Sequence, residues 1–288
     1  MPPQKTPVLD ELAVENATGD IKDIYNAIET ALGVRLVNLV YRHLATVPGA
    51  LEWAWSTVGP VFQNGKFAEC ATALGSDGEI PASVDTSMDA GVSLCLAGLS
   101  EDHGNRVVET LDAYNRANPM NALSLRVIAM ALEVGRPALW QATVPAHEGP
   151  PDTGKLSVLL PMASLDGLPP ATIDILYRLA GLTTGQDRGL VPSLFRHFTA
   201  WPALLAALAD WLEPLAEEGV IEQQVVHVSA YADEVAKDIF GQLDRPGDGA
   251  VLPGAATRET LLRTIEIFPP VICRMIVIGG LLRAAIRP

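Results

Sequence analysis

Residues 194–202 read LFRHFTAWP, and residues 40–48 read VYRHLATVP. In both stretches an Arg-His pair follows an aromatic residue, and a proline stands five residues after the histidine. The two copies are 154 residues apart, and the correspondence continues without a gap to Gly65 and Gly219. Agreement over so long a stretch indicates an internal repeat, and this repeat decides the fold.

A second match supports the duplication. The first half closes with ETLDAYNRANPMNAL from Glu109 and the second with ETLLRTIEIFPPVIC from Glu259, so that Pro119 faces Pro269 at an offset of 150 residues. Between the halves, PAHEGPPDTGKLSVLLPMASLDGLPP is rich in proline and glycine, which is typical of a linker. We therefore expect an N-terminal arm over 1–17, helical repeat A over 18–144, a linker over 145–166 and helical repeat B over 167–288.

The hydrophobic period within each half is helical. GDIKDIYNAIETALG places four apolar residues on one face before a glycine cap at Gly33: Ile21, Ile24, Ile28 and Leu32. PATIDILYRLAG repeats this pattern from Pro170, and no run of alternating strand residues occurs. We predict an all-α fold of two tandem helical repeats forming a pseudo-two-fold bilobal protein. Four prolines are expected to divide the longer apolar stretches into short helices: Pro48, Pro60, Pro202 and Pro214.

Composition excludes several classes of function. The 288 residues are 49% hydrophobic and carry a formal net charge of -14, which opposes binding to nucleic acids and to anionic membrane surfaces. The three cysteines are scattered, and the N-terminal residues include prolines and acids where a signal peptide would need an apolar run. The most apolar stretch, from Val271, contains Arg274 and is too short to span a bilayer. We expect a cytoplasmic protein without nucleic-acid or membrane partners, and a homodimer stays open.

The polar motifs have structural interpretations. Adjacent helical residues point about 100° apart, so an Arg-His pair does not grip one ligand, and bridging between helices is expected of the arginines. Asn115 and Asn118 precede Pro119, where asparagine commonly caps a helix. The acids Asp233, Glu234 and Asp238 fit a solvated helix face. No metal-binding spacing, nucleotide motif or serine-hydrolase motif occurs, so metal ligation, nucleotide binding and serine-hydrolase chemistry have no support in the sequence.

Three stretches together resemble one known family. They are DIYNAIETALGVRLVNLVYRHLATVPGALEWAW from Asp23, YNRANP from Tyr114 and SLFRHFTAWP from Ser193. With the duplication, they resemble the group I 2-haloacid dehalogenases, the halocarboxylic acid dehydrogenase family, over nearly the whole chain. The resemblance implies an all-α enzyme without metal or cofactor. It also implies that an aspartate activates water to displace halide from small 2-haloalkanoic acids, without an ester intermediate.

The resemblance implies roles for particular residues. Asn118, directly before the proline of an Asn-Pro pair, matches the catalytic asparagine, whose amide can orient a water for attack. The aspartate is expected after a serine and seven residues before the Trp-Pro pair, where this chain has Ser193 followed by Leu194. Leucine cannot take a proton. Asp187 is the nearest acid in sequence that could replace the missing base.

The implied substrate pocket is apolar. Besides Ser193 and Leu194, it includes Leu36 and Leu39, where the family pattern has aromatic residues, and Phe268, where it has a tyrosine. The hypothesis is a haloacid-dehalogenase-like enzyme that binds a small organic substrate between its lobes. Three alternatives stay open at this point: a dehalogenase or related hydrolase, an isomerase- or cyclase-type enzyme that shapes an apolar substrate, and a non-catalytic small-molecule-binding protein.

Overall fold

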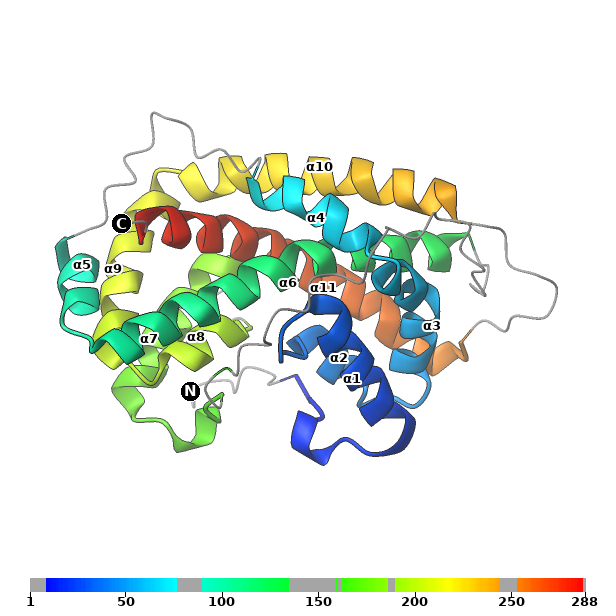
Figure 1. Ribbon diagram of the computed structural model, residues 1–288, viewed down its shortest axis with the longest axis horizontal. Coiled ribbons are helices and arrows are strands. Elements are labelled where there is room, and N and C mark those ends of the chain that lie inside the picture. The colour runs from blue at the N-terminus through cyan, green and yellow to red at the C-terminus, as the bar shows by residue number, and fades with distance from the viewer. Residues whose placement is uncertain are drawn as a thin grey trace, which may run out of the picture.

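The computed structural model describes residues 9–76, 90–134, 159, 162–185, 190–243 and 253–286. All regular secondary structure within these residues is helical. Figure 1 shows the helices as two groups around a central pair. This confirms the all-α prediction for the described part of the chain. In chain order the helices are η1 (Val14–Asn16), α1 (Gly19–Leu32), α2 (Leu39–Leu44), α3 (Ala50–Gln63), α4 (Lys66–Ser76), α5 (Ala90–Ala97), α6 (Glu101–Glu133), η2 (Leu165–Gly167), α7 (Pro170–Thr184), α8 (Ser193–Phe198), α9 (Pro202–Glu217), α10 (Val220–Gln242) and α11 (Ala255–Ala285).

The two halves of the chain have their α-helices in the same order. Helices α1 to α4 precede α6, and helices α7 to α10 precede α11, with α5 as an addition in the first half. Gly65 and Gly219, 154 residues apart, have φ values of 80° and 76°. They turn the chain from α3 into α4 and from α9 into α10, in a conformation that favours glycine. This order is what two tandem repeats require.

The packing of the helices follows the same correspondence. Helix α1 packs on α3 as α7 packs on α9, and α3 contacts α4 as α9 contacts α10. Two further contacts cross between the halves, because α2 packs against α11 and α8 packs against α6. The superposition of Arg42 on Arg196 and of Pro119 on Pro269 stays a prediction.

Helices α6 and α11 form the centre of the molecule and share its most extensive described contact (Figure 1). In this contact the Asn115 amide nitrogen donates a hydrogen bond to the Gly279 carbonyl oxygen at 3.0 Å. A Cβ atom on Gly279 would lie 2.0 Å from the Asn115 Oδ1 atom, so any larger residue here would have to displace the Asn115 side chain. Asn115 therefore joins two helices, and its predicted role as a helix cap is wrong.

Only two of the four prolines predicted to interrupt helices do so. Pro48 lies between α2 and α3, and Pro202 begins α9. Pro60 and Pro214 instead lie inside α3 and α9, in the last turn of each helix. A proline there removes one backbone hydrogen bond, and the buried apolar faces of both helices outweigh this loss.

The Asn-Pro pair lies inside a long helix. Helix α6 continues through Pro119 for another fourteen residues, to Glu133, so Asn118 is a mid-helix residue and its interpretation as a cap is wrong. Helix α11 likewise continues through Pro269 and Pro270. Packing on both sides of each proline holds these helices together, which a local sequence rule does not include.

Other expectations from the sequence have mixed outcomes. Helix α11 has the length and composition of a membrane span, so the expectation that this region is too short is wrong. Of its most apolar 18-residue window, 61% is buried inside the protein.

Asp233 is half exposed, as a solvated face predicts, but its carboxylate forms an ion pair with the buried Arg126. Residues 135–158, which include the end of repeat A and the start of the predicted linker, lie outside the described residues.

Candidate functional site

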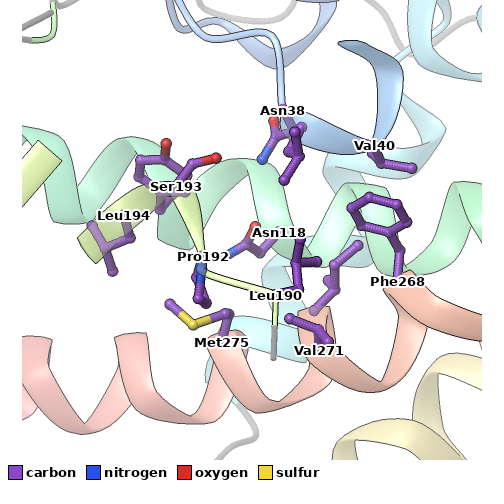
Figure 2. Close-up of a pocket in the computed structure, with 13 residues that line it drawn as sticks. Asn38, Val40, Asn118, Leu190, Pro192, Ser193, Leu194, Phe268, Val271 and Met275 are labelled. Carbon is purple, nitrogen blue, oxygen red and sulfur yellow. The ribbon is translucent and has the colours of Figure 1, made fainter. Parts of the chain in front are cut away.

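A cleft opens where the two central helices meet the first residues of α2 and α8. It encloses about 440 Å³ of empty space, part of which is open to solvent. Helix α6 contributes Tyr114 and Asn118, and helix α11 contributes four apolar residues. Figure 2 shows the amide groups of Asn38 and Asn118 directed into this space, above Val271 and Met275 of α11. The lining residues are Asn38, Leu39, Val40, Tyr114, Asn118, Leu190, Pro192, Ser193, Leu194, Phe268, Val271, Ile272 and Met275.

Helical spacing explains why these side chains meet. Tyr114 and Asn118 are one turn apart and therefore lie on the same face of α6. The α11 residues, Phe268, Val271, Ile272 and Met275, follow the i, i+3, i+4, i+7 spacing of a single helix face. The cleft thus has one wall with polar groups and one that is apolar.

Five of the six site residues predicted from the sequence line this cleft: Leu39, Asn118, Ser193, Leu194 and Phe268. Leu36 is buried but is not among the lining residues. Asp187, the acid considered as a replacement base, lies outside the described residues.

Two polar residues of the cleft were missed. Tyr114 stands one helical turn before Asn118, and Asn38 directly precedes α2. The one-turn spacing was a usable signal for Tyr114, provided that the helix was known to continue through Pro119. Asn38 has no such signal, because its place depends on how α2 packs against α11.

Residues of the two Arg-His pairs connect the N-terminal arm with α2 and α8. Glu11 of the N-terminal arm contacts both arginines, Arg42 at 2.9 Å and Arg196 at 3.0 Å. Arg42 is buried, and its Nη2 atom also donates to the Ser193 hydroxyl at 3.3 Å. His43 contacts the Asp10 carbonyl oxygen at 2.9 Å through Nδ1. Arg42 bridges α2 and α8 as expected, whereas the described partners of Arg196, which are Glu11 and the Ala163 carbonyl oxygen, lie outside the helices. The sequence did not predict the partner in the arm.

The Tyr114 hydroxyl is buried and makes no hydrogen bond within the described structure. Burial raises the pKa of Tyr114 well above its usual value, and Arg42, Ser193 and Arg196 oppose this shift. The hydroxyl is therefore protonated at neutral pH, so it can donate a hydrogen bond but cannot act as a base. The ring of Tyr114 packs edge-on near the ring of His197, with centroids 5.8 Å apart.

No described lining residue of the cleft is an Asp, Glu, His, Lys or Arg. Leu194, in the position where the family resemblance implies an aspartate, is 1% exposed, and its counterpart Val40 is equally apolar. The described residues also contain no cluster of three His, Cys, Asp or Glu side chains that could hold a metal ion. The described cleft can therefore orient and polarise a molecule, but it holds no group that would accept a proton at neutral pH.

Comparison with known proteins gives likeness in structure alone. No family model matches this chain, and no curated protein matches it. A D-2-haloacid dehalogenase mutant in complex with D-2-CPA superposes with a TM-score of 0.75 and 16% identity, covering 97% of this chain and 96% of that one. The fold is that of a D-2-haloacid dehalogenase.

Two further structures agree. A D-2-haloacid dehalogenase mutant has a TM-score of 0.78 at 15% identity, with 99% of this chain and 98% of the other covered. A D-2-haloacid dehalogenase in complex with L-LA has a TM-score of 0.71 at 16% identity, with 99% of both chains covered. Coverage this complete means that the likeness includes both halves of the chain and the central helices that carry the cleft.

Proposed function

We propose that this protein is a divergent haloacid-dehalogenase-like enzyme that binds a small organic substrate in the cleft and does not release halide by hydrolysis. The fold likeness and the family resemblance support the first part. The uncharged lining of the described cleft, with Leu194 in place of the expected acid, supports the second.

The decisive observation is that the described residues of the cleft include no base. Direct attack by water on a carbon that carries halide needs a group that accepts the proton of that water. Asn118 can orient a water through its amide, but an amide is not a base at neutral pH. Removing a general base lowers a rate by roughly 10²- to 10⁴-fold, so the cleft should support little dehalogenation even if a haloacid enters it.

The apolar wall favours a second chemistry on the same scaffold. Phe268, Val271, Ile272 and Met275 would pack against a carbon skeleton, while Asn118 and Tyr114 would hold a polar group. Such a site suits an isomerase- or cyclase-type reaction, in which holding the substrate in one conformation supplies much of the rate enhancement. A binding protein without catalysis would have the same cleft and would show affinity without turnover.

The remaining features of the proposal come from composition and from the resemblance. We place the protein in the cytoplasm, acting without metal or cofactor on a small organic molecule, as a monomer or a homodimer. The net charge of -14 supports the absence of nucleic-acid and anionic-membrane partners.

Halide release tests the proposal directly. An ion-selective electrode should detect no halide above the buffer rate when the protein is mixed with racemic 2-chloropropionate at neutral pH. Binding of small uncharged aromatic compounds should be measurable by calorimetry, and Met275→Trp, which fills the cleft, should abolish it while leaving the helical circular dichroism spectrum unchanged. Brisk halide release would contradict the proposal, and Asp187→Asn would then identify the base.

A further inference from the structure

The Tyr114 hydroxyl needs a partner that the described residues do not supply. The side chain is 3% exposed, lines the cleft and makes no hydrogen bond. A buried hydroxyl without a hydrogen bond lowers stability, and native structures leave few such groups. An unpaired donor in a substrate cleft is explained if the substrate itself provides the acceptor.

Ser193 supplies a second donor beside it. The Ser193 oxygen accepts a hydrogen bond from Arg42 Nη2 at 3.3 Å, so its own proton is available to another group. The Ser193 hydroxyl also lies close enough to the Tyr114 hydroxyl to oppose the rise in the tyrosine pKa by a hydrogen-bonding interaction, although the two groups do not meet the geometry of a full hydrogen bond. The two hydroxyl groups therefore form one donor cluster at the polar end of the cleft.

The charged groups near this polar end of the cleft, which are Arg42, Arg196 and Glu11, strengthen the two hydroxyl groups as hydrogen-bond donors. Arg42 and Arg196 share one carboxylate, that of Glu11, so the cluster keeps a net positive charge. Arg42 lies 3.3 Å from the Ser193 hydroxyl, and the two arginines lower the pKa of Tyr114 while Glu11 raises it. A positive field behind an O–H group makes it a better donor toward a partly negative oxygen.

We propose that Tyr114 and Ser193 form a hydrogen-bond-donor site for the carbonyl oxygen of a neutral substrate, and that Arg42, held by Glu11, is a positioning residue for it. The inference rests on the proposed function, since it assumes that a small organic molecule occupies the cleft. A carboxylate fits less well, because the arginines lie behind the two hydroxyl groups and are already paired with Glu11, and no charged side chain lines the described cleft to pair with the anion directly.

Infrared spectroscopy of a bound ketone tests the site. Acetophenone with a ¹³C-labelled carbonyl should bind to the whole protein, with its carbonyl stretch lower in frequency than in an apolar solvent. Tyr114→Phe should move the band back upward and weaken binding by about tenfold, the loss of one good hydrogen bond. Ethylbenzene, which lacks the oxygen, should bind equally to both proteins.

A matched control separates the site from general effects on buried tyrosines. Tyr41 is also buried, but its hydroxyl is paired with Asn121 at 3.0 Å and lies near Ser124 Oγ at 3.1 Å, and Tyr41 does not line the cleft. Tyr41→Phe should leave the carbonyl band and the affinity for acetophenone unchanged. Arg42→Lys keeps the charge but loses the planar fork, and it should move the band part of the way upward.

The outcomes distinguish this inference from the proposed function. If acetophenone binds but Tyr114→Phe changes neither its band nor its affinity, the donor site is overturned while the cleft remains a small-molecule site. If benzoate binds more tightly than acetophenone, the choice of a neutral substrate is overturned. If neither acetophenone nor ethylbenzene binds, the proposed function fails and the inference fails with it. An unshifted band in Arg42→Lys would overturn the role of Arg42.

Discussion

Helices α6 and α11 occupy matching places in the two halves of the chain, line the same cleft and differ in chemistry. Helix α6 presents Tyr114 and Asn118, while α11 presents Phe268 and three aliphatic or thioether side chains. Asn118 and Phe268 both stand directly before a proline, at the offset of 150 residues that relates Pro119 to Pro269.

The difference shows how two helices in matching places along the chain can build an asymmetric site. Two related helices bring equivalent positions to one space, and each position can then change independently. In this chain one helix keeps hydrogen-bonding groups and the other forms a wall for carbon. A site made of two identical halves would present the same groups on both of its walls.

The largest expected loss of stability follows from a substitution in the contact between α6 and α11. Gly279→Val would place a Cβ atom 2.0 Å from the Asn115 Oδ1 atom, so α11 would have to move away from α6 or Asn115 would have to give up its hydrogen bond. We expect a loss of about 3 kcal/mol in the free energy of unfolding, at the upper end of the range for overpacking. Chemical denaturation measures this loss.

A second variant tests whether the loss comes from this contact. In an Asn115→Ala background the obstructing side chain is absent, so Gly279→Val should cost much less than in the unaltered chain. Equal costs in the two backgrounds would show that Asn115 does not set the distance between the helices.

Making the cleft more like a dehalogenase site is expected to have the next largest effect. Leu194→Asp places a carboxyl group in a buried, apolar position and should lower the free energy of unfolding by about 2 kcal/mol at neutral pH. Desolvation raises the pKa of such an aspartate in the folded state, so the folded protein holds the proton more tightly than the unfolded chain. The cost should therefore be smaller in mild acid and should grow as the pH rises.

The same variant should gain halide release. Only the ionised carboxylate can take a proton from water, so release from 2-chloropropionate should increase with pH between about 6 and 10. Leu194→Asn, which has the same shape but cannot act as a base, is the control and should stay inactive. Equal activity of the two variants would show that position 194 does not carry the base.

The sequence was sufficient for the fold because its signals are local or periodic. The spacing of Ile21, Ile24, Ile28 and Leu32 defines a helix face without reference to the rest of the chain. Gly65 and Gly219 mark two turns that the backbone confirms as left-handed. Repeated motifs at a nearly constant offset add the order of the helices.

The sequence was less informative about prolines and polar contacts. Pro60 and Pro119 lie inside helices because packing outweighs one lost backbone hydrogen bond, and local rules contain no term for that packing. The bridge from Glu11 to Arg42 and Arg196 joins residues from three distant parts of the chain. The place of Asn38 in the cleft likewise depends on tertiary contacts.

The smallest expected effect comes from comparing two buried tyrosine hydroxyl groups, that of Tyr41, which is hydrogen-bonded to α6, and that of Tyr114, which belongs to α6. Toward the core, Asn121 of α6 accepts a hydrogen bond from the Tyr41 hydroxyl at 3.0 Å. Tyr41→Phe removes this bond and leaves a buried amide oxygen unpaired, so the free energy of unfolding should fall by about 1 kcal/mol.

Toward the cleft, the Tyr114 hydroxyl has no partner to lose. Tyr114→Phe should therefore leave stability unchanged or raise it slightly, because it removes an unpaired buried group. Urea denaturation of both variants at neutral pH measures the contrast, and an equal loss in the two would mean that Tyr114 is already satisfied without a substrate.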